Sequence, residues 1–183
     1  MRIISGKYKG KRLTAPSKLP VRPTTDFAKE ALFNVLNNHY YFNELTVTDL
    51  FAGTGNISFE FASRGCEHLK AVDAHSGCVQ YIRKISEELE FNIQCIKSDV
   101  FVYLEKATGE SDIIFADPPY DMPAEKLMEM ADLVFKNELL GEEGMLIIEH
   151  SKHVALETHP YFNNARKYGG SVFSFFEWPD EES

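Results

Sequence analysis

The sequence predicts an α/β fold: a mostly parallel seven-stranded sheet with an antiparallel C-terminal edge, preceded by a small N-terminal β-hairpin. Short apolar segments alternate with segments whose apolar residues recur at helical spacing, an order typical of a parallel sheet with helices on both faces. Near the C-terminus two strand-like segments flank Gly169-Gly170 with no room for a helix. A hairpin is therefore expected over 165–178, and it would supply the antiparallel edge.

The N-terminal part is expected to hold a hairpin, a linker and one helix. Residues 3–6 and 10–13 have the pattern of two short strands around a glycine-containing turn, and the prolines that follow favour an extended linker. Thr24 or Thr25 can cap the next helix, whose apolar residues recur at helical spacing as far as Asn38.

The main domain is expected over 24–183, after an extension over 1–23. Strands are expected near 46–51, 68–73, 92–97, 111–116 and 144–150, and helices near 56–64, 76–90, 99–107 and 123–137. Ligands of such open sheets bind at the carboxyl ends of the strands. Residues that follow these strands are therefore the first candidates for a functional site.

Length and composition are those of one ordinary globular domain. A chain of 183 residues can bury a substantial core, and its apolar and charged fractions are typical. The apolar runs are too short to span a bilayer and none resembles a signal peptide, so we expect a cytoplasmic protein. Cys66, Cys78 and Cys95 form no Cys-x-x-Cys pair, so we expect small buried or half-buried thiols and no metal site.

Charge is distributed unevenly along the chain. The net charge is −9, but residues 1–29 carry eight basic side chains and one acidic side chain. The N-terminal arm is thus basic and the remaining body acidic. One interpretation is a surface that contacts phosphates; the other is a solvated, lysine-rich hairpin with no partner. Charge alone leaves both open.

A glycine-containing loop follows the first strand of the main domain. Its residues are Asp49, Phe51, Ala52, Gly53, Thr54 and Gly55, and a helix follows. Glycines allow the backbone to approach a ligand closely. A dinucleotide-binding loop would read Gly-x-Gly-x-x-Gly, but here the third glycine position is Ser58. The loop therefore fits the S-adenosylmethionine site of a class I (Rossmann-like) methyltransferase better than an NAD site.

Acids at the ends of the next two strands fit the same cofactor. Asp73 ends the second strand 20 residues after Gly53, with Ala74 after it, and its carboxylate can accept both hydroxyls of a ribose. Asp99, followed by Val100, ends the third strand and suits an adenine amino group and ring. Asp73 could instead be an ordinary solvated strand end, but its spacing from the glycines favours the cofactor.

The loop after the fourth strand predicts the reaction. Asp117, Pro118, Pro119 and Tyr120 form a stiff turn that is rich in acceptors, because proline fixes φ and lacks an N–H. The Asp117 carboxylate and the Pro118 carbonyl can bind the two protons of an exocyclic base amine and expose its lone pair for in-line methyl transfer. Tyr120 can stack on an extruded base. The same four residues could be only a rigid turn, but their context with the glycine loop favours catalysis.

Several further segments resemble one bacterial family. They are Arg2 to Gly6, Gly10 to Leu13, Arg22 to Asp26, Glu30 to Asn34 and Ser63 to Gly65, in addition to the two loops. With them the chain resembles, almost end to end, the RsmD-type family that methylates a guanine N2 in small-subunit (16S) ribosomal RNA. The arginine-proline-threonine segment and the Glu-Ala-Leu-Phe-Asn segment after it are the most specific to that family.

The resemblance implies a substrate and a binding surface. The expected partner is 16S ribosomal RNA within a small-subunit particle, and the enzyme is expected to be a monomer. The residues expected to contact RNA are Lys7, Lys9, Lys11, Arg12, Arg22 and Thr24. This chain has Phe27 and Lys29 where the family usually or often has arginine, which implies that two phosphate contacts are weakened or lost.

Three alternatives remain. Adenine-N6 methyltransferases acting on DNA or RNA share the Asp-Pro-Pro-Tyr string, although DNA enzymes generally need a target-recognition region for which little of this chain is left. A non-catalytic RNA-binding assembly factor could keep the fold, but the intact Asp117 and glycine loop argue against it. NAD-dependent oxidoreduction is disfavoured by Ser58.

Overall fold

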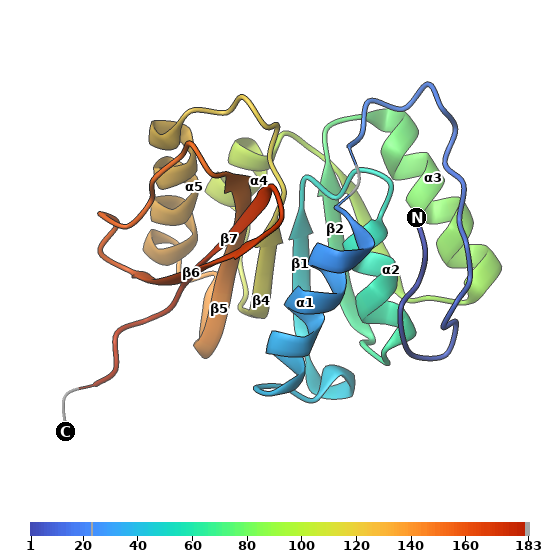
Figure 1. Ribbon diagram of the computed structural model, residues 1–183, viewed down its shortest axis with the longest axis horizontal. Helices are drawn as coiled ribbons and strands as arrows, with labels where there is room; N and C mark the ends of the chain where they lie inside the picture. Colours follow the sequence, from blue (N-terminus) through green and yellow to red (C-terminus); the bar gives the residue numbers. More distant parts are fainter. Residues whose placement is uncertain (23, 182–183) are drawn as a thin grey trace.

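The computed structural model describes residues 1–22 and 24–181 and contains a seven-stranded sheet in the order β3-β2-β1-β4-β5-β7-β6 (Figure 1). The strands are β1 Thr46–Leu50, β2 His68–Asp73, β3 Ile93–Lys97, β4 Ser111–Ala116, β5 Leu140–Ser151, β6 Phe162–Tyr168 and β7 Ser171–Phe176. The strands β3, β2, β1, β4 and β5 pair in parallel, and β7 pairs antiparallel with β5 and β6. The predicted fold class and antiparallel edge are confirmed.

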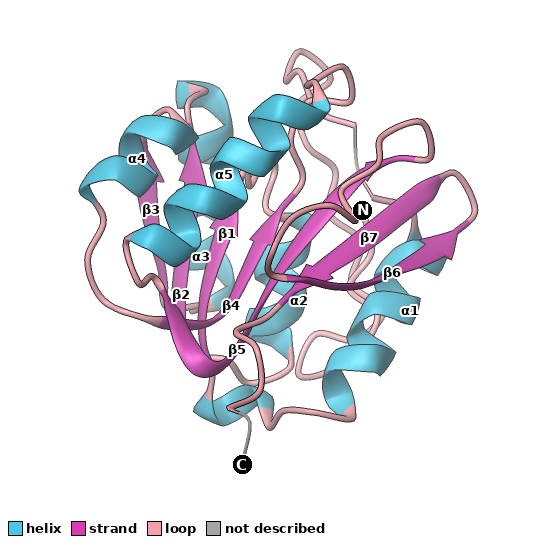
Figure 2. Cartoon of the chain, turned by 90° about the vertical axis from the view of Figure 1, so that its left-hand side faces the viewer, coloured by secondary structure: helices cyan, strands magenta, loops and turns pink. Residues whose placement is uncertain are grey.

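Helices cover both faces of the sheet. The helices are α1 Asp26–Asn37, α2 Asn56–Ser63, α3 Ser76–Leu89, α4 Val100–Lys106 and α5 Ala124–Lys136. Buried side chains of α1, α2 and α3 pack on one face, and those of α4 and α5 pack on the other. Figure 2 shows β7 and β6 at the outer edge of the sheet, with α1 close to them.

Most predicted boundaries agree with the structure to within one or two residues. Thr25 is the N-cap of α1, because its side chain accepts a hydrogen bond from the Ala28 N–H at 3.2 Å. Strand β5 begins at Leu140, four residues before its predicted start, and a register irregularity between Ser111 and Ile113 accompanies this extension. A short 3₁₀ helix, Phe42–Glu44, was not predicted.

The N-terminal hairpin differs from the prediction. Instead of two strands there is one isolated antiparallel bridge between Arg2 and Arg12. Beside it the Ile3 N–H donates to the Lys11 carbonyl at 2.9 Å, and the Ile3 carbonyl accepts from the Gly10 N–H at 2.8 Å. Ile3 and Leu13 are buried in the same apolar cluster as residues of α3. Regular strand pairing is unnecessary because the arm is stabilised by packing on the main body.

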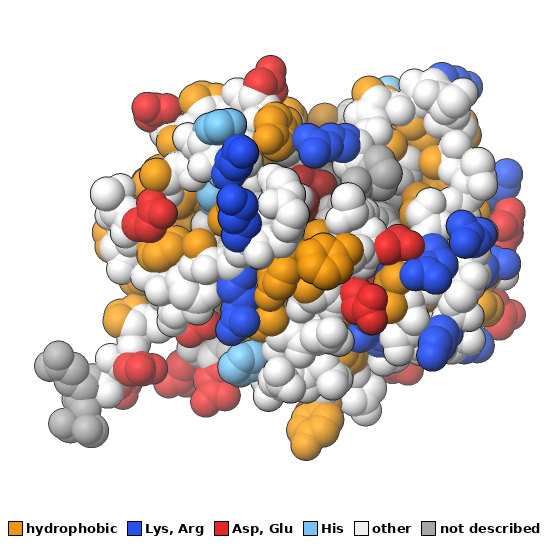
Figure 3. All heavy atoms as spheres, in the orientation of Figure 1, with side chains coloured by type: hydrophobic (Ala, Val, Ile, Leu, Met, Phe, Trp, Pro, Cys, Tyr) orange, Lys and Arg blue, Asp and Glu red, His pale blue; other side chains and the backbone are white. Residues whose placement is uncertain are grey.

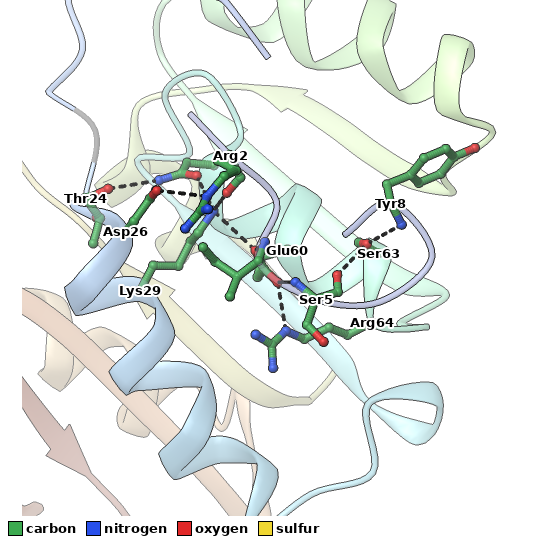
Figure 4. Close-up of polar contacts among 11 residues, drawn as sticks. Arg2, Ser5, Tyr8, Thr24, Asp26, Lys29, Glu60, Ser63 and Arg64 are labelled. Atoms are coloured by element: carbon green, nitrogen blue, oxygen red, sulfur yellow. Dashed lines mark hydrogen bonds and ion pairs between the residues drawn. The ribbon is translucent and has the colours of Figure 1, made fainter. Parts of the chain in front are cut away.

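A buried acid of α2 anchors this arm (Figure 4). The Glu60 carboxylate accepts hydrogen bonds from the backbone N–H groups of Ile4 at 2.8 Å and Ser5 at 3.1 Å. It also pairs with Lys29 at 3.2 Å and Arg64 at 2.8 Å. Because two cations and two amides meet this fully buried carboxylate, its charge is well compensated.

Lys29 is therefore a structural residue. Its side chain is buried and donates to the Arg2 carbonyl and to Asn56 Oδ1, in addition to pairing with Glu60. Burial lowers the pKa of Lys29, and the Glu60 carboxylate opposes that shift. The interpretation of Lys29 as a weakened phosphate contact was wrong, since the ammonium group points into the protein. Phe27 is 66% exposed, and its ring lies edge-on to Tyr168.

Other predictions can be compared with the described residues. Cys66 and Cys78 are buried and Cys95 is half-buried, all as free thiols, as predicted. Pro23, the predicted end of the N-terminal extension, lies outside the described residues, as do positions 182 and 183 at the predicted end of the main domain. No helix within 1–22 and 24–181 is long and apolar enough to cross a membrane.

Candidate active site

One cavity of about 540 Å³ opens at the carboxyl ends of the strands. It lies over β1 and β4, which are neighbours in the sheet although they are distant in the sequence. At such a switch in strand order the connections lead to opposite faces of the sheet and leave a crevice for a ligand. The volume is in the range of pockets that hold small molecules and cofactors.

The glycine loop forms the cavity wall after β1. Phe51, Ala52, Gly53 and Thr54 line the cavity. Phe51 has φ +54°, an unusual conformation for a bulky residue and of a kind that clusters at ligand sites. Gly55 lies behind the wall at φ +85°, where a Cβ would approach the Phe59 ring to 2.9 Å. Its role in the structure is therefore to allow α2 to begin close to its neighbours.

Asp49 is a buried acid beneath this loop. It is 1% exposed, lines the cavity and accepts a 2.6 Å hydrogen bond from the Ser58 hydroxyl. Burial raises the pKa of Asp49 to about 7, and the Ser58 hydrogen bond opposes the shift. Ser58, the residue that departs from the dinucleotide pattern, thus positions the carboxylate of the loop.

The two predicted strand-end acids also lie at the cavity. Asp73 accepts hydrogen bonds from the backbone N–H groups of Gly53 and His75, both at 2.8 Å, so it connects β2 to the glycine loop. Asp99 caps α4 by accepting from the Val102 N–H at 3.1 Å. Each carboxylate oxygen can accept more than one hydrogen bond, so these structural contacts leave acceptor capacity for a ligand.

The Asp-Pro-Pro-Tyr loop forms the facing wall. It follows β4 directly, and Asp117, Pro118, Pro119 and Tyr120 all line the cavity. Burial raises the pKa of Asp117 strongly, and the nearby Glu149 carboxylate raises it further, whereas the Arg22 guanidinium opposes the shift. The structure therefore brings both predicted loops into one cavity.

Arg22 and Tyr120 stand together at the mouth of this cavity. The Arg22 guanidinium lies 4.8 Å from the centre of the Tyr120 ring, which is 55% exposed. Thr24 is buried close by and also lines the cavity. Of the six residues predicted to contact RNA, Arg22 and Thr24 lie at the site.

The other four basic residues lie elsewhere. The exposed side chains of Lys7, Lys9, Lys11 and Arg12 belong to the arm and do not line the cavity. The Lys7 N–H bonds to the Ser63 carbonyl at 2.7 Å, at the far end of α2 from the glycine loop. In Figure 1 the arm runs over the right-hand side of the molecule, and its turn lies at the bottom, away from the carboxyl ends of the strands.

A second group of exposed basic side chains, outside the N-terminal arm, was not predicted. Lys152, Arg166 and Lys167 are exposed around the C-terminal hairpin. Figure 3 shows Lys and Arg side chains in a line down this part of the molecular face. The predicted and unpredicted basic groups thus lie on different parts of the molecule.

Several lining residues were also missed. They include Glu149 and His150 on β5, Ser171 on β7, and the apolar residues Met122, Leu127 and Val154. Glu149 carries the same signal as Asp73 and Asp99, an acid after an apolar strand, and could have been found. His150 donates from Nδ1 to the Ser151 carbonyl at 2.8 Å, and its Nε2 lies 2.6 Å from the Ser174 hydroxyl. Burial lowers the pKa of His150.

The lining residues fit S-adenosylmethionine. Five carboxylates, Asp49, Asp73, Asp99, Asp117 and Glu149, line the cavity, and among the described residues one arginine or lysine, Arg22, does so. That surplus of acid suits a ligand with a positively charged sulfur and amino group. No group of three His, Cys, Asp or Glu residues within 1–22 and 24–181 could hold a metal ion.

Sheet order, glycine loop and cavity together define a class I S-adenosylmethionine-dependent methyltransferase. The solved structure of the yhhF protein of Escherichia coli has a TM-score of 0.83 to this chain, with 27% identity over 96% of each chain.

The sequence comparisons define the family more closely. The family model described as conserved hypothetical protein 95 matches residues 1–177, and the chain belongs to this family, the RsmD family. The YlbH protein of Bacillus subtilis is 36% identical over 85% of both chains. Ribosomal RNA small subunit methyltransferase D of Escherichia coli is 29% identical, over 87% of this chain and 79% of the relative.

Proposed function

We propose that this protein transfers a methyl group from S-adenosylmethionine to the exocyclic N2 of a guanine in small-subunit (16S) ribosomal RNA. The observation that carries the proposal is that the Asp117–Tyr120 loop and the glycine loop line one cavity. A site for an amino group therefore adjoins a site for the methyl donor. The relatives named ribosomal RNA small subunit methyltransferase D support ribosomal RNA as the substrate.

In the cofactor half of the cavity, each acidic residue would bind a different part of S-adenosylmethionine. Asp73 would accept the ribose hydroxyls, while Asp99 and Val100 would hold the adenine amino group and ring. Asp49 and the residues from Phe51 to Thr54 would line the remainder of the binding site. S-adenosylmethionine supplies a methyl group already activated by positive sulfur, so the protein need not supply a strong base.

The base half of the cavity holds the acceptor nitrogen. The Asp117 carboxylate and the Pro118 carbonyl would accept the two N–H groups of the amine, and Pro119 would keep this turn rigid. Orientation of this kind can lower a barrier by about 7–11 kcal/mol in well-aligned systems. Asp117, whose pKa is raised by burial and by Glu149, would also take up the proton that the nitrogen releases.

Tyr120 would stack on the extruded base. Stacking on an aromatic ring is worth about 1–3 kcal/mol per base, comparable with the few kcal/mol needed to extract the base. Arg22 covers one face of the ring, so the base would stack on the opposite face or displace Arg22. The proposed RNA surface includes Arg22 and Thr24 at the cavity and, at a distance from it, Lys7, Lys9, Lys11 and Arg12 on the arm. A monomer acting on a small-subunit particle is the proposed form.

The test uses S-adenosylmethionine with a labelled methyl group and small ribosomal subunits that lack the modification. Nucleoside mass spectrometry should find the label in N2-methylguanosine, and the particle and its naked RNA should be assayed side by side. The Asp117→Asn variant is the negative control, because its side chain keeps its size and loses its charge. Label in N6-methyladenosine would overturn the proposal.

A further inference from the structure

The cavity contains a second buried acid beside the catalytic loop. In the parallel pairing of β4 with β5, Ala116 lies opposite Ile148, so Asp117 and Glu149 follow at the same level of neighbouring strands. Both line the cavity, and Glu149 is 8% exposed. The base half of the site therefore presents two carboxylates side by side.

Two neutral hydroxyl groups hold Glu149 in place. Thr24 Oγ1 donates to Glu149 Oε2 at 2.8 Å, and Ser171 Oγ donates to Oε1 at 2.9 Å. No lysine or arginine of the described chain lies within salt-bridge distance of it. Each oxygen accepts one hydrogen bond and has a second acceptor position free.

Glu149 contrasts with Glu60, a buried glutamate that does not line the cavity. Glu60 is matched by two cations and two backbone amides, as a structural acid should be. Glu149 has no comparable cation and lies in a cavity wall, so burying its charge is costly until another donor arrives. A donor group on the ligand would satisfy it.

Guanine and adenine differ at the ring nitrogen N1, where a donor for Glu149 would have to lie. Beside its exocyclic amine, guanine carries an N1–H, a donor. Beside its own exocyclic amine, adenine carries N1 with a lone pair, an acceptor. Two adjacent carboxylates match the amine and N1–H of guanine, whereas one of them would face the N1 lone pair of adenine.

We propose that Glu149 is the specificity-determining residue of the base site, accepting the N1–H of the target guanine while Asp117 holds its amino group. This inference rests on the proposed function and adds to it the reason why guanine is selected. Thr24 and Ser171 are positioning residues that turn the Glu149 oxygens toward the base. Loss of a hydrogen bond to a charged group changes discrimination by about 10- to 100-fold.

The decisive substrate carries 2-aminopurine in place of the target guanine. This base keeps the 2-amino group but has an N1 lone pair instead of N1–H. The wild-type protein should methylate guanine with a kcat/KM at least about 10-fold higher than 2-aminopurine. In Glu149→Gln the ratio should fall toward one, because an amide can either accept from N1–H or donate to a bare N1.

The control is Glu142→Gln, the same change at an exposed residue of β5, which should keep the wild-type ratio. Calorimetry should show that Glu149→Gln still binds S-adenosylmethionine. If that variant does not fold, Thr24→Val and Ser171→Ala each remove one donor, and each should lower the ratio.

The outcomes separate the two proposals. N6-methyladenosine as the wild-type product would overturn both. N2-methylguanosine from the wild-type protein, with a guanine to 2-aminopurine ratio that stays unchanged in Glu149→Gln, would overturn the role of Glu149 alone. If Glu149→Gln does not fold, an unchanged ratio in both hydroxyl variants would do the same.

Discussion

The guanidinium of Arg22 lies over the ring of Tyr120 at 4.8 Å, so the ring that we propose stacks on the base has a cation on one face. Arg22 comes from the segment before α1, and Tyr120 from the loop after β4. The two walls of the cavity mouth therefore meet through this pair. A base that stacks on Tyr120, as we propose, would contact a ring whose position depends on both segments.

Arg22→Ala should raise the KM for RNA by about 10-fold and change the affinity for S-adenosylmethionine little. The change removes both a positive charge near phosphates and a stacking contact worth about 0.5–1 kcal/mol at an exposed site. Arg22→Lys should recover only part of the loss, because lysine lacks the planar group. Steady-state kinetics on small subunits would check this; a lysine variant equal to wild type would show that charge alone matters.

Asp117→Ala should abolish methyl transfer while leaving the cofactor affinity nearly intact. The side chain lies in the loop after β4, whereas the acids assigned to the cofactor lie within β1, at the end of β2 and after β3. Single-turnover assays and calorimetry would measure the two properties separately. Asp121→Ala, an exposed acid that does not line the cavity, is the matched control. Joint loss of transfer and cofactor binding would mean that Asp117 is structural.

Replacing Lys7, Lys9 and Lys11 together by alanine should weaken RNA binding and flatten its dependence on salt. Each phosphate contact that is lost reduces the slope of log K against log salt by about 0.7–0.9. Replacing Lys84, Lys106 and Lys136, three exposed lysines elsewhere on the body, makes the same charge change and should leave the slope unaltered. Equal slopes for wild type and the arm variant would remove the arm from the RNA surface.

Lys29→Met should destabilise the protein by about 3 kcal/mol, because it leaves the buried Glu60 short of a cation. Glu60→Gln in the same chain should restore part of that loss, since the remaining charge is then removed. Urea unfolding would give both free energies. Additive losses in the double variant would show that the two side chains act independently.

Asp49 should make the protein less stable as pH rises from about 4 to about 7. Its pKa is raised from 3.8 to about 7 in the folded protein, so the folded state binds a proton that the unfolded state has released. The stability that this proton provides is complete below pH 4 and is lost as pH passes 7, up to about 4 kcal/mol in all. Asp49→Asn should remove this part of the pH dependence in unfolding measurements, and an unchanged profile would contradict it.

The strand-end motifs could be predicted because strand order, chain direction and ligand position are linked in an open α/β sheet. Asp73, Asp99 and Asp117 follow apolar strands, and the structure places all three at one cavity. Glu149 has the same signal at the end of β5 but belongs to no short motif. Its partners, Thr24 and Ser171, come from distant segments, so their meeting depends on tertiary packing.

Charge in the sequence was less informative than position. Lys7 and Lys29 contribute equally to the basic arm, yet one is exposed and the other is buried beside Glu60. The spacing of residues within α1 could not reveal this, because the acid that pairs with Lys29 lies on α2. Counting charges measures the electrostatic balance of a segment but not which side chains reach the solvent.

The attachment of the arm at the far end of α2 fixes the distance between the arm and the glycine loop. Lys7 is fixed to Ser63, and the glycine loop lies at the other end of an eight-residue helix. At 1.5 Å per residue that helix measures about 12 Å. A ligand that touches both the arm and the cavity must span at least that length, as the proposed polynucleotide substrate would.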